Sequence, residues 1–585
     1  MESSLSPKLK ATLLTLHAIF ITVVLVLAFV FLPKDNKSSP VTKLQSIKLP
    51  DNVLEPDYPH YTASGKIVFL YRNSIDNQHY VAVINDDGTD LRNIYNGEPK
   101  PFYNNTNGIR LMPFKDNKRI LLGDGILECE PSIDEVTDPE KQTKIIPIEY
   151  PEELLKFKSL FMLWSEIIIS PDNVHMGWSS LLYSGAIVFI SRLERLESHS
   201  NERNFISPRI DITRNKNVAN DVKYVMKNVQ IVSDLAYMKV DPDHPGFIIP
   251  SKYIHGGEIK QFTFDCQKLT LVGATTSGLA RSVLQNLNDD IVSPICHEAG
   301  YDETTIISPN GKLGIVMTSR FSPKTSCSIL GILPRPYSSF GLMSFTQAVY
   351  TYSVTGVRLA RKGNIGPALI DIEESLNDND QERKYHGIDI HDPKDEYVFR
   401  SPMSWHYSSQ RAIWLENAKN QMSKTRIRQV ILDSSVYPPS EPLKCEKETP
   451  DNIPYALDIS ALANMSVSMY SGKIASPLGI EKGGYIDFEY KATSTNVTYV
   501  NYTEDGTNFF DGSEGYSMNY QTMGSYYQGN VVMFNLNGNQ RKVVGEMNFK
   551  ITFSNPNNDM KLIREESYGK ATYKGITVTV DDMED

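Results

Sequence analysis

The sequence predicts an all-β protein: a six- or seven-bladed β-propeller followed by a C-terminal antiparallel β-sandwich-like domain, with one N-terminal transmembrane helix. Three observations support this prediction. Runs rich in Tyr, Val, Ile, Thr and Phe alternate with polar residues, and Gly, Asn, Asp or Pro interrupts them every few positions. A two-strand phrase recurs along the chain, and an uncharged apolar run lies near the N-terminus. The 585 residues are also too many for one hydrophobic core, so several units are expected.

The apolar run covers residues 11–32 and contains no Asp, Glu, Lys or Arg. It is long enough to cross a bilayer, which needs about twenty residues, and it lacks the small-residue cleavage pattern of a signal peptide. We expect a short cytosolic tail (1–10), a transmembrane signal anchor (11–32) and a stalk (33–50). The chain would then be a single-pass type II membrane protein with an extracellular or lumenal ectodomain. A secreted protein is the alternative.

The orientation of this anchor depends on the flanking residues. Lys8 and Lys10 precede the run, but Lys34, Lys37, Lys43 and Lys48 follow it, so the positive-inside count does not favour a cytosolic N-terminus. N-glycosylation sequons favour a lumenal ectodomain, and they lie at Asn36, Asn104, Asn464, Asn496 and Asn501.

The recurring phrase is clearest from Glu166 to Trp178, where an apolar run leads into a tight turn and a second alternating run follows. Pro171 sets φ for the turn, and Asp172 and Asn173 bond locally or accept left-handed angles. We call such turns marker turns, and they lie at Ala63–Lys66, Phe114–Arg119, Ser170–Asn173, Phe264–Lys268, Ser308–Gly311 and Trp405–Arg411. Their spacing of about 45–55 residues, or roughly double where one is missing, is the length of a four-stranded propeller blade.

The propeller is predicted over residues 51–445, and degenerate units in 200–250 and 345–400 would supply a seventh blade. After Pro454 the alternation becomes longer and more regular. This change predicts a separate sandwich-like domain over 455–585.

Charge and cysteine content exclude some classes of function. The net charge of -11 offers no basic stripe for phosphates, so no nucleic-acid partner is expected. The five cysteines contain no C-x-x-C pair and the histidines form no ligand motif, so we expect no metal and no cofactor. At most two disulfides can form, and the spacing does not assign the pairs.

The innermost strand of each blade precedes its marker turn and borders the central channel. This position is predicted for Arg110, Trp164, Glu166, Glu258, Asp302, Glu303 and Thr304. The aspartates of the turns are instead predicted to be turn formers, and these are Asp87, Asp116, Asp172 and Asp265.

Glu166 and Glu303 are the candidate catalytic residues, because two carboxylates across a channel can serve as acid and as base or nucleophile. The alternative for Glu166 is a strand cap or an ion pair with a lysine of the neighbouring blade. Arg110 and Arg320 would bind a substrate carboxylate, and a surface salt bridge is the alternative for Arg320. Trp164 and Asp302 complete the predicted substrate-binding set.

Four segments resemble the fungal saponin hydrolases, which are secreted propeller enzymes with TolB-type repeats. The segments are Pro113–Cys129 with Lys144–Ile148, Glu166–Trp178, Ser308–Arg320 and Tyr502–Glu514. The resemblance covers most of the chain from about residue 60 and implies a glycoside hydrolase that acts on a glucuronide-type glycoside such as a triterpenoid saponin. The chain departs from the family in its membrane anchor and at Trp405–Ser408, where the family tends to have Trp-Ser-Pro-Asp.

The expected partners are therefore a carbohydrate or glycoside substrate in the channel and a membrane at the N-terminal helix. A non-catalytic propeller that binds a glycan or a protein at the membrane surface is the alternative. A uronate lyase is a third possibility, and a metal or histidine cluster in the channel would favour it.

Overall fold

The structure is a computed structural model of the chain. It describes residues 41–96, 110–157, 163–182, 185–197, 222–233, 238–250, 255–274, 280–321, 329–339, 366–392, 396–418, 421–464, 471–491, 493–519, 524–554 and 561–583. The predicted cytosolic tail, the predicted transmembrane segment and the first part of the stalk lie outside these residues. Among the residues that are described, no helix is long and apolar enough to cross a membrane.

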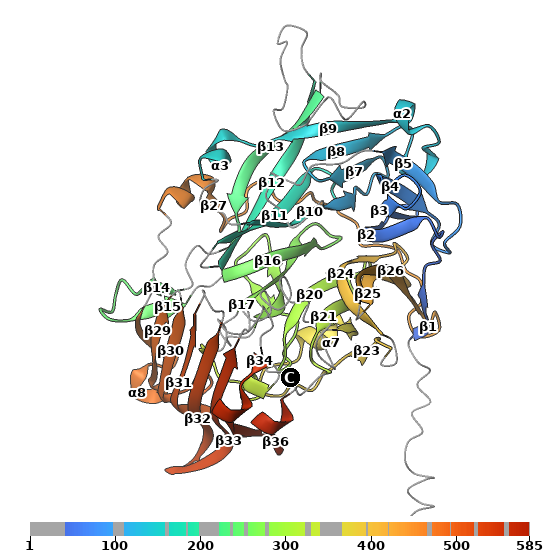
Figure 1. Ribbon diagram of the computed structural model, residues 1–585. Coiled ribbons are helices and arrows are strands. Elements are labelled where there is room, and N and C mark those ends of the chain that lie inside the picture. Colours follow the sequence, from blue (N-terminus) through green and yellow to red (C-terminus); the bar gives the residue numbers. More distant parts are fainter. Residues whose placement is uncertain are drawn as a thin grey trace, which may run out of the picture.

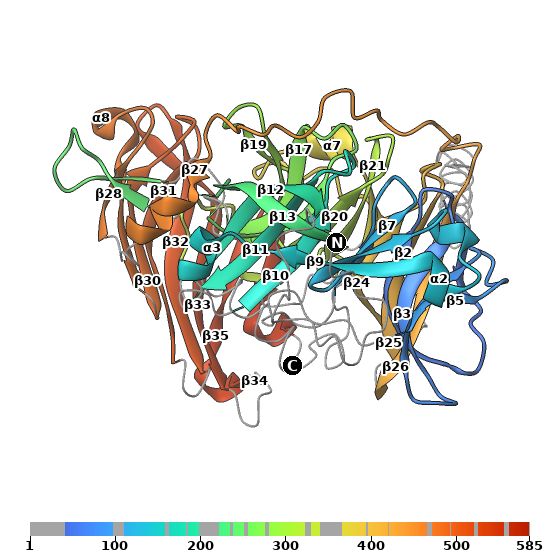
Figure 2. The ribbon, with the colours of Figure 1, turned by 90° about the horizontal axis from the view of Figure 1, so that it is seen from above.

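The predicted β-propeller is confirmed by the sheet topology, and Figures 1 and 2 show its sheets arranged around a common centre. The described residues form six four-stranded antiparallel units. The first three are β2–β5 (Val53–Tyr61, Ile67–Asn73, His79–Ile84, Arg92–Asn96), β6–β9 (Leu111–Pro113, Arg119–Leu122, Gly125–Cys129, Thr143–Glu149) and β10–β13 (Leu163–Ile169, His175–Leu182, Gly185–Glu197, Val222–Ile231). The others are β16–β19 (His255–Phe262, Lys268–Ala274, Ala280–Asn286, Val292–Pro294), β20–β23 (Asp302–Ile307, Leu313–Thr318, Gly366–Asp371, Ile388–Asp389) and β24–β26 (Tyr397–Trp405, Arg411–Ala418, Gln421–Leu432) with β1 (Val41–Ser46).

We number these units as blades 1 to 6 in that order. Connections hold short helices, namely α2 (Pro139–Gln142), α3 (Glu152–Lys156) and α7 (Ile372–Leu376), and a hairpin of β14 (Met238–Val240) and β15 (Ile248–Pro250). Blades 2 and 3 are also joined edge to edge, because β9 pairs with β13 in parallel.

Each blade has its marker turn between its first two strands, and all six turns share one backbone conformation. The left-handed residue is Gly65, Asn117, Asn173, Cys266, Gly311 or Ser409, with φ between 58° and 88°. In every turn its N–H donates to the carbonyl three residues earlier. The predicted turn-forming aspartates are confirmed, since Asp172 Oδ1, for example, accepts the N–H of Val174 at 2.9 Å.

The ring is closed by the N-terminal end of the described chain. β1 pairs antiparallel with β26, so that Val41 lies opposite Leu432 and the strand becomes the outermost one of blade 6. The predicted stalk over 33–50 is therefore wrong for residues 41–46, which belong to the propeller. Their hydrogen-bonding groups complete the open edge of β26, which would otherwise lack a partner.

Residues 433–456, which we call the strap, run from blade 6 back over the marker turns of blades 5, 4 and 3 (Figure 2). Leu443 N–H donates to Pro309 O (2.8 Å), and Gln267 Nε2 donates to Lys447 O (2.9 Å). A disulfide joins Cys266 in the marker turn of blade 4 to Cys445 in the strap. Of the other cysteines, Cys129 and Cys296 are buried and free, and Cys327 lies outside the described residues.

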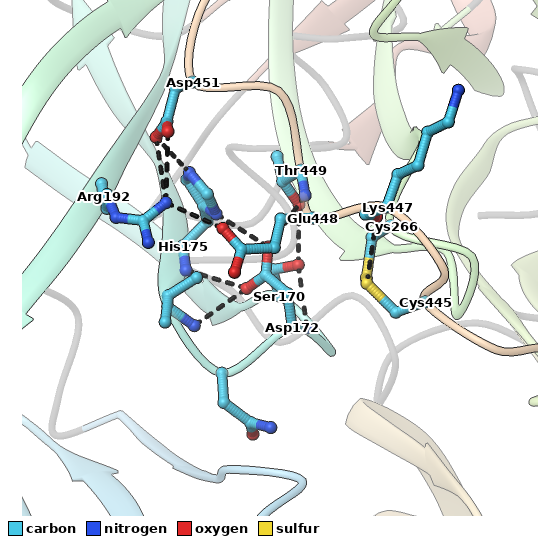
Figure 3. A network of polar contacts seen from close by, with 12 residues as sticks. Ser170, Asp172, His175, Arg192, Cys266, Cys445, Lys447, Glu448, Thr449 and Asp451 are labelled. Atoms are coloured by element: carbon cyan, nitrogen blue, oxygen red, sulfur yellow. Dashed lines mark hydrogen bonds and ion pairs between the residues drawn. A yellow bond between two sulfur atoms is a disulfide. The ribbon is translucent and has the colours of Figure 1, made fainter.

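The strap reaches blade 3 at a buried histidine, shown in Figure 3. His175 Nδ1 lies 2.7 Å from Asp172 Oδ2, and His175 Nε2 lies 2.9 Å from Asp451 Oδ1 of the strap. Burial by itself would lower the pKa of His175, but the hydrogen bonds and charges of the two aspartates outweigh it and raise the pKa above its usual value. The imidazolium therefore bridges the turn of blade 3 and the strap.

The C-terminal region is a single antiparallel sheet, so the predicted two-layered sandwich over 455–585 is corrected. Its path runs β28 (Ser471–Ala475), β29 (Tyr485–Lys491), β30 (Ser494–Tyr502), β31 (Phe509–Met518), β32 (Ser525–Asn537), β33 (Gln540–Ser554), β35 (Tyr568–Tyr573) and β36 (Ile576–Thr579), with β34 (Lys561–Leu562) beside β33 and α8 (Ile480–Gly483) before β29. The preceding β27 (Leu457–Asp458) pairs with β13 of blade 3. Figures 1 and 2 both show the sheet standing at one side of the propeller.

The second layer against this sheet comes from the propeller. Residues 329–339, between β21 and β22 of blade 5, place Ile329, Leu330, Leu333 and Tyr337 in one hydrophobic core with the inner face of the sheet. Arg335 of this segment forms a bidentate pair with Glu514 of β31, with Nε–Oε1 at 2.7 Å and Nη2–Oε2 at 2.9 Å. Both side chains are at most 2% exposed, so the pair fixes the segment on the sheet without competition from water.

The bridge at His175 predicts a pH dependence of stability. A raised folded pKa stabilises the protein fully below the unfolded pKa of about 6.5, and this contribution is lost as the pH rises through the higher folded value. We expect His175→Gln to lower the unfolding free energy by about 1.5–3 kcal/mol at pH 5–6 and by less above pH 7, in denaturant titrations. The matched control is His244→Gln, whose Asp241 partner lies at 2.9 Å but whose side chain is 71% exposed. A cost of His175→Gln that does not change with pH would contradict the bridge.

The Arg335–Glu514 pair predicts a second loss of stability. Glu514→Gln leaves a buried guanidinium without its counter-charge, so we expect a loss of about 3–5 kcal/mol in unfolding free energy. Glu546→Gln is the control on the same sheet, since its partner Lys570 is 3.9 Å away and both side chains are more than half exposed, and it should cost at most about 1 kcal/mol. Equal losses for the two variants would show that the pair does not hold the segment in place.

Candidate functional site in the central channel

The innermost strands carry irregularities that direct side chains toward the channel. Register shifts interrupt β2, β10, β16, β20 and β24 near their middle. In β10 the shift falls between Ser165 and Ile167, so Glu166 is the extra residue, and its φ is 44°. Such a bulge turns one side chain away from the regular alternation, and a left-handed non-glycine residue costs about 1–3 kcal/mol.

Three carboxylates from adjacent blades meet at one lysine. Lys260 Nζ lies 2.8 Å from Glu258 Oε2, 3.2 Å from Glu166 Oε1 and 3.6 Å from Glu303 Oε1. The Lys260 side chain is 2% exposed. The predicted alternative for Glu166, an ion pair with a lysine of the neighbouring blade, is therefore the one observed.

This cluster controls the protonation of its members. Burial would raise the pKa of Glu166, but the charges of Lys260 and Arg110 outweigh it and hold the pKa below its usual value. Burial would likewise lower the pKa of Lys260, but the three carboxylates raise it well above its usual range. Both groups are thus charged at neutral pH, and Glu166 does not have the raised pKa that a proton donor needs.

Arg110 is the second cation of this layer. Its guanidinium lies over the Tyr58 ring, 5.2 Å from the centroid, and burial raises the pKa of Tyr58 to about 12. Arg110 Nε is buried and has no hydrogen-bond acceptor among the described residues. The Nε–H of Arg110 is therefore available to a ligand. Burial would lower the pKa of Arg110, but the charges of Glu166, Glu258 and Asp57 nearby raise it.

The marker-turn end of the channel is narrowed by Lys115 of blade 2. Its Nζ lies 4.7 Å from the centroid of Phe264 in blade 4 and 4.9 Å from that of Tyr407 in blade 6. Because these residues belong to alternate blades, the contact crosses the channel. Burial lowers the pKa of Lys115 to about 8 and the pKa of His60 nearby to about 3.

Between these two layers lies a cavity of about 90 Å³. Its charged lining consists of Arg110, Lys115, Lys260 and Glu166, and its ring-bearing lining consists of Tyr58, His60, Tyr61, Phe262, Phe264 and Trp405. Sites for drug-sized ligands occupy about 300–1,000 Å³. This cavity admits a small ligand group and no whole sugar chain. Three carboxylates surround Lys260, so Arg110 and Lys115 are the lining cations that could meet an anion.

The structure brings together most, but not all, of the predicted site residues. Glu166, Glu258 and Glu303 converge at Lys260, and Arg110 and Thr304 line the cavity. Asp302 and Arg320 do not line it; instead Arg320 Nη2 lies 3.0 Å from Asp302 Oδ1, with both side chains 1% exposed. The backbone of Trp164 in β10 pairs with that of Ser180 in β11, and its side chain lies outside the described atoms.

Lys260 and Lys115 were not predicted from the sequence. Lys260 follows Glu258 by two residues in a predicted inner strand, so strand alternation placed both side chains on one face. Lys115 occupies the turn position that Pro171 and Pro309 fill in blades 3 and 5. This difference between the marker turns is the sequence signal that could have identified Lys115. Among the described residues, no group of three or more His, Cys, Asp and Glu side chains could hold a metal ion.

The spacing of the acids bears on catalysis. Glu166 Oε1 and Glu303 Oε1 are both within reach of Lys260 Nζ, so their separation cannot exceed the sum of 3.2 and 3.6 Å. That limit overlaps the separations of about 5–5.5 Å in retaining and about 6.5–9.5 Å in inverting glycosidases. However, Lys260 contacts both carboxylates, so each already has a buried counter-charge.

Comparisons with known proteins add little to this description. No protein-family model and no curated protein sequence matches the chain. An oligogalacturonate lyase from Vibrio parahaemolyticus is 10% identical over 69% of this chain and 96% of its own, with a TM-score of 0.34. TolB from Acinetobacter baumannii is 10% identical over 65% of each chain with a TM-score of 0.28, and oligopeptidase B from Leishmania major is 8% identical over 89% of this chain and 54% of its own with a TM-score of 0.24.

Scores this low carry no argument about function. The blade topology defines a propeller-type protein, and the resemblance to the saponin hydrolases stays a prediction.

The charge cluster predicts that replacing Lys260 lowers the unfolding free energy by an amount that depends on pH. Lys260→Met leaves three carboxylates close together, so we expect the unfolding free energy to fall by about 3 kcal/mol or more at pH 7. The loss should shrink toward pH 4–5, because carboxylates without a counter-charge become protonated there. Lys223→Met is the control, since Lys223 pairs with the half-exposed Glu149 at 2.9 Å, and it should cost at most about 1 kcal/mol. A loss that is no larger at pH 7 than at pH 4–5 would contradict the cluster.

Proposed function

We propose that the protein is a six-bladed propeller, anchored in a membrane by residues 11–32, that binds the carboxylate end of a glucuronide-type glycan without cleaving it. The observation that carries this proposal is the position of Lys260 between Glu166 and Glu303. Both carboxylates neutralise a buried ammonium, so neither is free to donate a proton to a leaving group or to attack an anomeric carbon.

The lining of the cavity supports an anionic ligand. Arg110 and Lys115 both line it, and neither forms an ion pair with a carboxylate among the described residues. A guanidinium with free N–H groups binds a carboxylate in a bidentate manner. The aromatic residues of the lining would then contact the apolar face of the sugar ring that bears the carboxylate. At about 90 Å³, the cavity would admit the uronate carboxylate while the rest of the glycan stays outside.

Hydrolysis is the second candidate function, and the convergence of the acids favours it. Glu166 and Glu303 reach the same point from blades 3 and 5, and Glu166 is held in a strained conformation. Strain of this kind is concentrated at functional sites. A substrate that displaces Lys260 would leave two carboxylates at a spacing that suits a glycosidase.

Binding is tested by calorimetry with methyl glucuronide and, as the uncharged counterpart, methyl glucoside. We expect binding of the glucuronide alone and at least about tenfold weaker binding by Arg110→Met, which corresponds to about 1.4 kcal/mol. Arg195→Met, on β12, the third strand of blade 3, is the control and should bind as the wild type does. Equal binding of both sugars, or full binding by Arg110→Met, would contradict the proposed role of Arg110.

The same samples decide between binding and hydrolysis. Mass spectrometry of a saponin glucuronide and an aryl glucuronide after incubation should show no released sugar. Sugar release by the wild type that disappears in Glu166→Gln or in Glu303→Gln would show that the protein is a glycoside hydrolase and not a binding protein. Neither binding nor release with any of these ligands would exclude both functions.

A further inference from the structure

The C-terminal sheet has one covered face and one open face. The inner face packs on residues 329–339 in a shared core. The other face is turned away from that core, and the strands alternate between buried and exposed residues, as in Asn496, Val497 and Thr498 of β30. In Figures 1 and 2 the sheet lies at the side of the molecule, and this outer face borders none of the blades that the structure describes.

The register aligns the outward residues of β30, β31, β32 and β33 into three rows across the strands. The rows are Ser494, Ser517, Tyr526 and Thr552; Asn496, Gly515, Gln528 and Lys550; and Thr498, Ser513, Asn530 and Asn548. We call these twelve positions the polar face. Lys550 is its only charged residue, and hydroxyl and amide groups fill all other positions except the central Gly515.

The polar face is hollowed. A depression of about 630 Å³ lies over it, and most of its lining consists of residues of the three rows. Gly515 has no side chain to fill the middle, and a Cβ atom there would lie 2.6 Å from Asn496 Oδ1. Strands lie about 4.8 Å apart, so the rows span roughly 14 Å. An extended ligand that crosses the strands would meet the same kind of groups at each one.

The groups of the polar face are available to such a ligand. Thr498, Ser513, Ser517, Asn530 and Asn548 are exposed. In the part of the chain that the structure describes, none of their side chains is hydrogen bonded. Hydroxyl and amide side chains both donate and accept hydrogen bonds, and they therefore match the hydroxyl groups of a sugar chain.

The distribution of charge favours a neutral ligand. The chain has 22% charged residues, and charged residues occupy outward positions beside the polar face, namely Asp487 and Glu489 on β29, Glu546 on β33 and Lys570 on β35. On the polar face itself, Lys550 alone carries a charge. A nucleic acid would need cations, and a protein interface would need an apolar or aromatic centre where the face has Gly515 and Gln528.

We propose that the polar face binds a neutral polysaccharide laid across β30–β33. This site is separate from the channel and takes a ligand of different charge, since the channel is proposed to hold a carboxylate. The two sites would let the protein hold one uncharged glycan on the sheet while its propeller binds an acidic one.

The test uses the full-length chain in detergent, with soluble β-glucan and galactomannan as neutral probes and polygalacturonate as the anionic one. Affinity electrophoresis measures the dissociation constants. The variant Asn530→Asp with Asn548→Asp keeps the shape of the face but replaces two amides by carboxylates, and we expect at least about tenfold weaker binding of a neutral probe. Gly515→Val, which fills the depression, should have the same effect, and Glu546→Gln beside the face should have none.

Arg110→Met separates this proposal from the proposed function of the channel, because it should leave binding of the neutral probe unchanged. No binding of either neutral probe would overturn the proposal, as would tighter binding of polygalacturonate than of both neutral probes. Binding that survives both the double variant and Gly515→Val in folded protein would place the site elsewhere and overturn it too. If a neutral probe binds only after a glycan has been removed enzymatically from Asn496, then the protein's own glycan covers the polar face. This result also contradicts the proposal.

Discussion

The closure of the propeller sheets around one axis is the constraint on which the rest of this structure depends; six such sheets lie in the part of the chain that the structure describes. Each blade must bring its first strand to the centre, where bulges in five of these strands turn side chains inward. The marker turns then lie together at one end of the ring, where Lys115 can contact Phe264 and Tyr407 across it. The strap uses the same geometry, because blades 5, 4 and 3 present their turns along one path. Closure therefore creates both the charged centre and the surface that the strap crosses.

Burying the charged centre costs desolvation free energy, and the contacts that offset this cost limit which protonation states its residues can adopt. Removing a lysine and three glutamates from water is repaid only by close contacts among them. Lys260 supplies those contacts to strands from blades 3, 4 and 5, and the same contacts hold Glu166 in its ionised form. An arrangement of acids that looks catalytic in position is thereby stabilised in a state that disfavours proton donation. Arg110, which lacks such a partner, is left as the group that can meet a ligand.

Local features of this fold could be predicted from the sequence, and distant pairings could not. The marker turns were predictable because Pro, Asp, Asn and Gly act on their own backbone. The placement of Glu166 and Glu303 in the channel followed from their positions before such turns. Asp302 and Glu303 are adjacent, however, and successive side chains of a strand point to opposite faces. One therefore reaches Arg320 and the other Lys260, and no local pattern shows which partner each one finds. Strand alternation likewise showed that β28–β36 have one apolar face, but only the structure shows that residues 329–339, far away in the chain, cover it.

The seam between β1 and β26 has a consequence for the order of events during synthesis. Gln45 and Gln429 hydrogen bond across it although they are 384 residues apart in the chain. β1 is made early and has no partner until the last blade has been made, so its edge is exposed to other chains for most of that time. The strap, which leaves β26 at Leu432, is likewise made only after the last blade. The pairing of β1 with β26 is thus the last step that closes the ring. Before this step the unpaired edge of β1 can pair wrongly with another chain or be bound by a chaperone.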